Sequence, residues 1–472
     1  MKIGIDARFY GPIGGGGLGR YTKELVDNLE QIDRTNQYVI FLCRENWDDY
    51  NPAHQNFRKV LAPYKWYSWR EQIFMPFKIW REKVDSMHFP HFNTPLIYVL
   101  FTRINANKKA NRREFFKGGF ILTVHDLILL KYPSKKATTL APIYFKLKFW
   151  VYKIVIRVAL RRAGKIIVPS NFVKNDIIKY FNVFNEKIEV IYEGVTDVDK
   201  ENGFRENRIM NHELGIREIK KLEIRNWKLG EGDEGIKYEE IEDVKEGDKK
   251  NKIWYNENKK LEIRNWKLEI KPYILYVGNA YPHKNLERLV GAFSLLIRKE
   301  GGDGREGKEG EEGKLEIRNL KLEIRNWKLV LVGVRNYFYE RLEEYVKDNF
   351  PDIKDRIIFL GYATDKELAQ LYKNAALYVF PSLEEGFGLP PLEAMSYGVP
   401  VISSDKSCLS EILSNAVLYF DAENSEDMAD KILCGLEDEK RRKDLIKKGY
   451  ERIQLYDWEK NARKTMEVYG EV

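Results

Sequence analysis

Cysteine is scarce in this chain of 472 residues, which contains only Cys43, Cys408 and Cys434. Three scattered thiols exclude a disulfide framework, and neither they nor the six histidines have the spacing of a zinc site. The sequence also has no run of about 18 uncharged apolar residues, as a transmembrane helix requires. The N-terminus, MKIGIDARF, lacks the apolar region of a signal peptide. We therefore expect a cytoplasmic protein in a reducing environment.

A strong excess of one charge is lacking too. Lys and Arg together number 80 and Asp and Glu 72, so the formal net charge is +8. This excess is mild for the length of the chain and does not favour nucleic acid as a partner. It is compatible with an anionic substrate or with an anionic membrane surface.

The chain does have enough residues, 43% of them hydrophobic, for two domains with substantial cores. Strand-like runs alternate with helical patterns, which predicts parallel α/β layers. The runs are KIGIDA, YVIFLC, DSMHF, FILTV, KIIVPS and IEVIY, followed in the second half by YILYVG, LVLVG, RIIFLG, LYVFPS, PVISS and AVLYF. We expect two doubly wound domains, 1–195 and 271–455, with ligands at the strand ends facing one cleft. Residues 456–472 are predicted to form a helix that packs back on the first domain.

A repeated heptapeptide, KLEIRNW or KLEIRNL, begins at Lys221, Lys260, Lys314 and Lys321. The irregular spacing excludes a solenoid. The flanks are rich in Gly, Lys and Glu, so we interpret the repeats as insertions into two surface loops, over 196–270 and about 300–328. The alternative is a binding platform made by Trp227, Trp266 and Trp327.

Residues 381–400, PSLEEGFGLPPLEAMSYGVP, carry the most chemical information. Glu385 and Glu393 are separated by seven residues. A strand, ALYVF, precedes them, and Pro391 favours the first turn of a helix that Gly398 would end. We expect Glu385 on the loop and Glu393 in the first helical turn. The alternative is a plain strand–loop–helix corner with two solvated glutamates.

The same corner predicts an anion site. The free N–H groups of Phe387, Gly388 and Leu389 would surround an anion at the start of the helix. One carboxylate would then face a reacting centre while the other accepts hydrogen bonds from hydroxyl groups. Ser382 is a further candidate to line this pocket.

A glycine-rich turn, GPIGGGGLGRYTKEL, follows the first strand. Gly16 and Gly17 would let the backbone close on a diphosphate, and the helix beginning near Arg20 would direct its positive end toward it. A P-loop is excluded because GK[ST] is absent, and Arg44 after the second strand disfavours a hydride-transfer enzyme, which needs an acidic residue there. A plain tight turn is the alternative.

Two more residues stand at predicted strand ends. His125 closes FILTV, where it could hydrogen-bond a ligand hydroxyl or orient a second substrate. Lys284, in YILYVGNAYPHKN, begins a helix and could neutralise a departing diphosphate. The alternatives are a structural histidine and a solvated lysine.

These motifs together resemble the retaining glycosyltransferases of the GT-B fold, glycosyltransferase family 4 or "glycosyl transferases group 1", with mannosyltransferase-like features. The resemblance covers 1–193 and 271–472. It implies two facing Rossmann-like doubly wound parallel-sheet domains with a cleft between them. Asn279 stands where the family commonly has an arginine, which Arg335 could partly replace, and Lys284 matches the family's lysine.

The resemblance implies transfer of a sugar, with GDP-mannose as the favoured donor, to a glycan or lipid-linked acceptor in cell-surface polysaccharide synthesis. Glu385 would contact the donor sugar, Glu393 the ribose, and Lys284 with backbone N–H groups the diphosphate, so no metal or other cofactor is expected. Retention would follow front-face attack. The alternatives are a UDP-glucose or UDP-galactose enzyme and a non-catalytic scaffold that binds sugar nucleotides.

Two segments, 65–83 and 141–165, mix Trp, Phe and Tyr with Lys and Arg. Such segments could lie on the inner face of the plasma membrane or beside a lipid-linked acceptor. The alternative is two core-packing helices with snorkelling lysines.

Overall fold

The computed structural model describes residues 1–11, 16–66, 68–102, 119–132, 142–195, 272–299 and 327–472. The four heptapeptides begin outside these ranges. Trp227 and Trp266 also lie outside them. Trp327 is described and is buried, with 6% of its surface exposed, so it cannot belong to an exposed platform.

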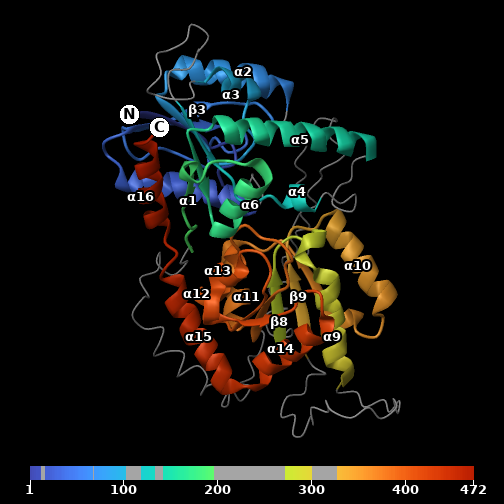
Figure 1. Ribbon diagram of the computed structural model, residues 1–472. Helices are drawn as coiled ribbons and strands as arrows, with labels where there is room; N and C mark the ends of the chain where they lie inside the picture. The colour runs from blue at the N-terminus through green and yellow to red at the C-terminus, as the bar shows by residue number, and fades with distance from the viewer. Residues whose placement is uncertain (12–15, 67, 103–118, 133–141, 196–271, 300–326) are drawn as a thin grey trace, which may run out of the picture. The chain divides into compact units, whose positions relative to one another are not determined.

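The first domain is built on a parallel sheet in the order β3-β2-β1-β4-β5-β6-β7 (Figure 1). Its strands are β1 (Lys2–Asp6), β2 (Gln37–Leu42), β3 (Phe57–Leu61), β4 (Ser86–Phe89), β5 (Phe120–Thr123), β6 (Lys165–Val168) and β7 (Ile188–Val190). Its helices are α1 (Gly17–Ile32), α2 (Trp69–Glu82), α3 (Leu96–Phe101), α4 (Ile128–Lys131), α5 (Pro142–Arg162), α6 (Asn171–Phe181) and the short η3 (Asn185–Lys187). All strand pairs are parallel, as right-handed βαβ crossovers produce.

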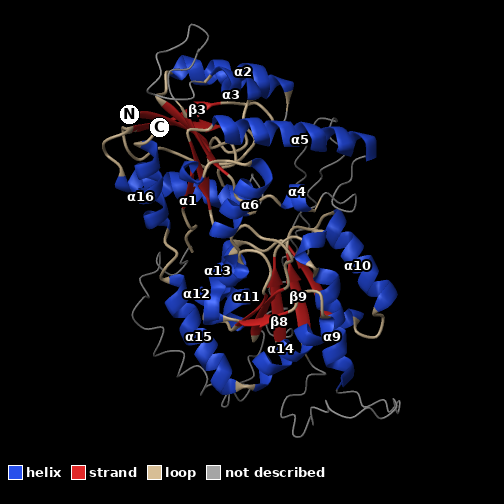
Figure 2. Cartoon of the chain, in the orientation of Figure 1, coloured by secondary structure: helices blue, strands red, loops and turns tan. Residues whose placement is uncertain are grey.

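The second domain has a parallel sheet in the order β10-β9-β8-β11-β12-β13. Its strands are β8 (Tyr273–Val277), β9 (Lys328–Val332), β10 (Ile357–Gly361), β11 (Leu377–Phe380), β12 (Val401–Ser404) and β13 (Leu418–Phe420). Its helices are α9 (Leu286–Lys299), α10 (Tyr337–Asn349), α11 (Asp365–Asn374), α12 (Leu389–Ser396), α13 (Leu409–Leu413), α14 (Ser425–Glu437) and α15 (Glu439–Ile453), with short helices η5 (Pro282–Lys284), η7 (Lys354–Arg356) and η8 (Ser414–Ala416). Helices flank the strands of both sheets (Figure 2). The fold is therefore the predicted pair of doubly wound domains.

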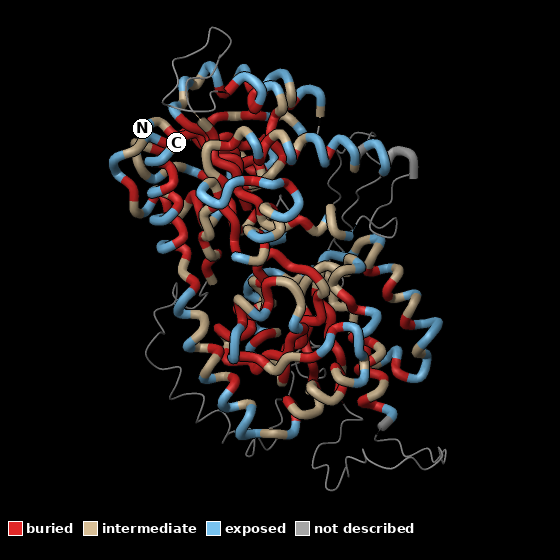
Figure 3. The backbone as a smooth tube through the Cα atoms, in the orientation of Figure 1, coloured by how far each residue is buried: buried red, intermediate tan, exposed pale blue. Residues whose placement is uncertain are grey.

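Buried residues follow most of the strands, as expected for parallel strands that helices cover on both faces (Figure 3). The last helix, α16 (Trp458–Tyr469), packs against α1 of the first domain. Its Trp458 and Tyr469 belong to the same core cluster as Ile3 and Leu25. The end of the chain thus contributes to the core of the first domain.

Two helix boundaries differ from the sequence prediction. Helix α1 begins at Gly17, three positions before Arg20. Helix α12 begins at Leu389, so Glu393 is its fifth residue and lies in the second turn. The N-cap is Gly388, whose backbone is left-handed, so the helix starts before the two prolines. It ends as predicted, because the N–H groups of Gly398 and Val399 bond to the carbonyls of Met395 and Ala394.

Helices α2 and α5 have both buried and exposed apolar side chains. Each buries one face, represented by Met75 and Ile79 on α2 and by Ile156 and Leu160 on α5. Each also exposes large apolar side chains: Trp69, Ile73, Phe74, Phe77 and Trp80 on α2, and Leu147, Trp150, Val151 and Ile154 on α5. Core packing alone does not account for these exposed faces.

Candidate functional site

An ion pair joins two loops at the carboxyl edge of the second sheet. Nζ of Lys284, in η5 after β8, lies 2.5 Å from Oε1 of Glu385, in the loop after β11. The two strands are neighbours, so their following loops meet at the same edge. Both side chains are largely shielded, at 13% and 10% exposed. The backbone N–H of Glu385 also donates to Oγ of Ser407 at 3.0 Å, which fixes the loop.

Asn285 anchors Lys284 from the next position. Its backbone has φ 61°, a left-handed conformation that asparagine tolerates. Its buried side-chain amide donates to the carbonyls of Pro381 at 3.1 Å and Ala422 at 2.7 Å. The loops after β8, β11 and β13 are therefore tied together below the ion pair.

Glu393 is held by two partners that the sequence did not suggest. Its Oε2 accepts a hydrogen bond from the hydroxyl of Tyr372 at 3.1 Å, and its Oε1 pairs with Nη1 of Arg20. Arg20 lies on α1 of the first domain. The charge of Glu393 raises the pKa of the Arg20 guanidinium. Both carboxylate oxygens are thus engaged before any ligand arrives.

The loop between the two glutamates lies tightly against the first domain. A Cβ atom on Gly386 would stand 1.7 Å from the carbonyl oxygen of His125, so only glycine fits. The carbonyl of Gly386 also accepts a hydrogen bond from Oγ of Ser170 at 2.7 Å. Gly388 follows with φ 93°, a conformation that L side chains rarely adopt, and caps α12. These two glycines let the loop pass close to the first domain and turn into α12.

His125 is hydrogen-bonded through both ring nitrogens. Its Nδ1 lies 3.0 Å from Oε1 of Glu193 and its Nε2 lies 2.9 Å from the carbonyl oxygen of Pro90. Burial lowers the pKa of His125, but Glu193 and the Pro90 carbonyl outweigh burial and raise it. Both partners offer acceptor oxygens, which favours a proton on each ring nitrogen. The expected bond from His125 to a sugar hydroxyl would have to displace one partner, so that role stays a prediction.

The remaining predicted donor-site residues have varied surroundings. Gly16 is the N-cap of α1, next to Gly17 at its first position. Asn279 accepts a bond from its own loop, at Tyr281, and Leu389 is half-buried at the start of α12. Phe387 is buried, and its ring contacts the rings of Tyr192 and Tyr456.

Two further side chains differ sharply in exposure. Ser382 is fully buried, and its Oγ finds no hydrogen-bond partner within the described ranges. Arg335, considered as a substitute for the missing arginine, is half-exposed and pairs with Glu343 at 2.5 Å. A ligand could reach Arg335 but not Ser382 without movement of the protein.

Sequence reasoning missed Arg20, Tyr372 and Glu193. Arg20 follows the glycine-rich turn, a place where a cation could have been weighed as a partner for an acid or a phosphate. Tyr372 and Glu193 lie in segments with no motif. No three His, Cys, Asp or Glu side chains gather as a metal site in the described part of the chain. Metal independence stays a prediction.

Two parallel-sheet Rossmann-like domains are the architecture of the GT-B glycosyltransferases. Family models agree: "Glycosyltransferase Family 4" matches residues 15–198 and "Glycosyl transferases group 1" matches residues 258–452. The chain belongs to this family of glycosyltransferases.

Similar proteins include two bacterial mannosyltransferases. "O-antigen chain mannosyltransferase B" of Escherichia coli is 32% identical over 42% of this chain and 45% of its own length. "O-antigen chain mannosyltransferase RfbU" of Salmonella typhimurium is 24% identical over 65% of this chain and 57% of its own length. The chain therefore spans about half the length of the curated relatives that it matches.

A solved structure shows the same fold. HepE of Anabaena, in complex with UDP and glucose, has a TM-score of 0.61 and 13% identity, and the match covers 100% of both chains. At this identity the likeness concerns the fold alone. No helix among the residues described here is long and apolar enough to cross a membrane.

Proposed function

We propose that this chain transfers a sugar from a nucleotide diphosphate sugar to a glycan or lipid-linked acceptor, with retention of anomeric configuration, in cell-surface polysaccharide synthesis. The observation that carries the proposal is the Lys284–Glu385 ion pair at the carboxyl edge of the second sheet. Open α/β sheets bind their ligands at this edge. The pair supplies a cation for a departing diphosphate and a carboxylate for the sugar.

Lys284 acts on the leaving group in this mechanism. As the bond between the sugar and the diphosphate breaks, negative charge grows on the phosphate oxygen, and a fixed ammonium stabilises that charge more than the ground state. Glu385 has its backbone held by Ser407, so its carboxylate stays near the sugar when Lys284 turns to the phosphate. The departing phosphate then accepts the proton of the acceptor hydroxyl, which attacks from the same face.

Glu393 binds the ribose in the proposed complex. Its two oxygens already accept from Arg20 and Tyr372. Ribose hydroxyls would replace the Arg20 contact, while the buried Tyr372 would keep the carboxylate in place. Arg20, once released, is a cation close to the glycine-rich turn and available to the diphosphate. It would offset the absence of an arginine at Asn279.

GDP-mannose is the proposed donor, and the two mannosyltransferase relatives support it. A UDP-glucose or UDP-galactose donor is the second candidate, favoured by the UDP and glucose held by the similarly folded HepE. A non-catalytic scaffold is the third, favoured by Asn279. The acceptor would be reached at the inner face of the plasma membrane.

A donor screen tests the proposal. The protein is incubated with GDP- and UDP-sugars, with and without lipid-linked acceptors, and nucleotide release is measured beside Glu385→Gln. Release of GDP from GDP-mannose that depends on Glu385 is the expected result. Release of UDP alone would identify a UDP-sugar, in place of GDP-mannose, as the donor. Binding of a sugar nucleotide without release would identify a scaffold. The anomeric configuration of the product, read by NMR, decides retention.

A further inference from the structure

Lys131, the last residue of α4, lies between two carboxylates. Its Nζ is 2.5 Å from Oδ2 of Asp176 on α6 and 2.7 Å from Oε1 of Glu384. The ammonium also lies 4.2 Å from the centre of the Phe172 ring. Only 15% of the Lys131 side chain is exposed, so burial lowers its pKa, but the two acids outweigh burial and raise it. Lys131 is therefore a fixed cation without a role in the mechanism above.

Glu384 directly precedes Glu385 in the loop between β11 and α12, residues 381–388. Glu384 accepts a hydrogen bond from Lys131 of the first domain, whereas Glu385 pairs with a lysine of the second domain. Burial raises the pKa of Glu384, and the ammonium of Lys131 opposes that rise. A buried carboxylate that lost this cation would take up a proton or move toward water. The contact with Lys131 thus fixes the charge and the place of the residue next to Glu385.

Backbone hydrogen bonds hold the loop on both sides of Glu384. On one side, the N–H of Leu383 donates to the carbonyl of His283 at 2.7 Å. On the other side, the carbonyl of Gly386 accepts the hydrogen bond from Ser170. These two anchors are neutral, whereas the ion pair of Glu384 is charge-assisted, and hydrogen bonds of that kind are roughly twice as strong. Loss of the ion pair should therefore loosen the middle of the loop.

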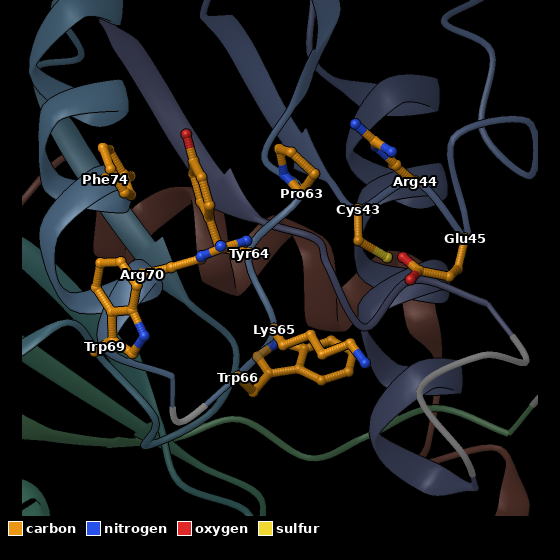
Figure 4. Close-up of a pocket in the computed structure, with 10 residues that line it drawn as sticks. All are labelled: Cys43, Arg44, Glu45, Pro63, Tyr64, Lys65, Trp66, Trp69, Arg70 and Phe74. Carbon is orange, nitrogen blue, oxygen red and sulfur yellow. The ribbon is translucent and has the colours of Figure 1, made fainter. Parts of the chain in front are cut away.

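The Lys131 cluster is separate from a cavity in the first domain. Figure 4 shows this cavity, about 890 Å³ in volume, with Arg44, Lys65 and Arg70 among its lining residues. Neither Lys131 nor its two acidic partners belong to the lining. Substitution of Lys131 therefore leaves the cavity wall as it is, and a resulting loss of activity would not come from a changed lining.

We propose that Lys131 is a positioning residue that holds Glu384 and, through the adjoining backbone, keeps Glu385 at the reacting sugar. This inference rests on the proposed function, which places Glu385 at the sugar. When Lys284 turns to the departing diphosphate, Glu385 loses its ion-pair partner and the loop depends on its other anchors. The Lys131–Glu384 pair persists at that moment, because the proposed mechanism gives neither residue a contact with the donor.

Kinetic constants of matched lysine variants test this inference. Lys131→Met should lower kcat about tenfold and leave the donor KM within about twofold, because a displaced reacting group slows the chemical step more than it weakens binding. Lys131→Arg keeps the charge and should retain most of kcat. Lys165→Met is the matched control, since Lys165 is also 15% exposed and lies 3.1 and 2.7 Å from the carboxylates of Glu189 and Glu471. An equal loss of kcat in Lys131→Met and Lys165→Met would overturn the inference.

A double-mutant cycle determines whether Lys131 acts through Glu384. Glu384→Gln should lower kcat by a similar factor, and the double variant Lys131→Met/Glu384→Gln should lose no more than either single variant. Asp176→Asn leaves the Lys131–Glu384 contact in place and should change kcat by less than about twofold. Additive losses in the cycle, or a loss in Asp176→Asn as large as in Lys131→Met, would overturn the inference and leave Lys131 with a purely structural role.

Amide hydrogen exchange tests the same contact without a donor. Melting curves first establish which variants are folded, and Glu384→Gln, which removes a single charge, serves where Lys131→Met is not. Exchange at the N–H groups of Leu383 and Glu385 should be about tenfold faster than in the wild type, and unchanged in Lys165→Met. Unchanged exchange in both Lys131→Met and Glu384→Gln would overturn the inference. A failed donor screen with the expected change in exchange would instead count against the proposed function alone.

Discussion

The acidic side chains of the candidate site are already paired. Glu385 holds Lys284, Glu393 holds Arg20 and Tyr372, and Glu193 holds His125. Each pair compensates the cost of keeping a charge in a shielded position. A donor must therefore exchange its own phosphate and hydroxyl groups for partners that the protein supplies to itself.

Lys284→Ala should lower kcat/KM about 10²-fold, because a preorganised charge on a developing diphosphate is typically worth about 3 kcal/mol. Steady-state kinetics with the donor found in the screen measures the loss. Lys347→Ala, which removes an exposed lysine from α10, is the control and should stay close to wild type. Nearly full turnover of Lys284→Ala would exclude Lys284 as the phosphate ligand.

The two glutamates should differ in which kinetic constant they affect. Glu385→Gln should mainly lower kcat, because the charge of the group that Glu385 contacts, the reacting sugar, changes in the transition state. Glu393→Gln should mainly raise the donor KM, because ribose contacts change little during the reaction. Separate measurement of kcat and KM decides between these roles. The reverse pattern would mean that the two carboxylates exchange their assignments.

His125 should titrate above its ordinary value of about 6.5 in the folded protein. A raised folded pKa adds stability that is fully present below about pH 6.5 and is lost as the pH rises through the folded pKa. Glu193→Gln should remove most of this contribution and lower the pKa of His125. An NMR titration of the His125 ring in both proteins measures the shift. Equal values would show that Glu193 does not hold the proton.

At the scale of single elements, the caps connect folding with the site. Ser170 accepts from the N–H of Val173 at the start of α6 and donates to the carbonyl of Gly386. Ser170→Ala should cost about 1 kcal/mol of unfolding free energy, as the loss of an N-cap does. It should also lower kcat/KM a few-fold by loosening the loop before Glu393. Asp438→Ala removes the cap of α15 at a similar cost and should leave kcat/KM unchanged. Urea unfolding and kinetics on both variants test this, and an equal effect on kcat/KM would refute the link.

The strands could be predicted from sequence because parallel strands covered on both faces are continuous apolar runs. Each run named from the sequence forms a strand. The missed strand, β3, reads FRKVL and lies at the sheet edge, where Arg58 and Lys59 interrupt the apolar pattern. Glu385 and Lys284 were found because each lies in a recognisable motif. Arg20 could not be paired with Glu393, because 373 positions separate them and nothing in either segment encodes the contact.

At the scale of the whole chain, polar contacts link residues of the two domains at several points. Glu411 accepts from the N–H groups of Asn171 and Phe172 at the start of α6, at 2.8 and 3.1 Å. Lys131 of α4 bonds to Glu384 at 2.7 Å. A carboxylate at a helix N-terminus is favoured by the helix dipole. These contacts lie around the loop that carries Glu385, so residues of both domains border the candidate site.

The repeat insertions should be dispensable for folding and donor turnover. Their Gly-rich and charged flanks have too few apolar residues for a core, which predicts exposed segments that a protease cuts first. The described strands of both sheets come from the rest of the chain. Replacing about 205–268 and 302–326 by short Gly-Ser linkers should leave donor turnover within a few-fold of the parent, because loop-closure entropy changes slowly with loop length.

Limited proteolysis of the parent and the activity of the doubly trimmed protein measure this prediction. Trimming each insertion alone provides the matched controls. A trimmed protein that is folded but inactive would place the repeats in acceptor binding. One that fails to fold would place them in the core, because folding would then depend on buried contacts that they make.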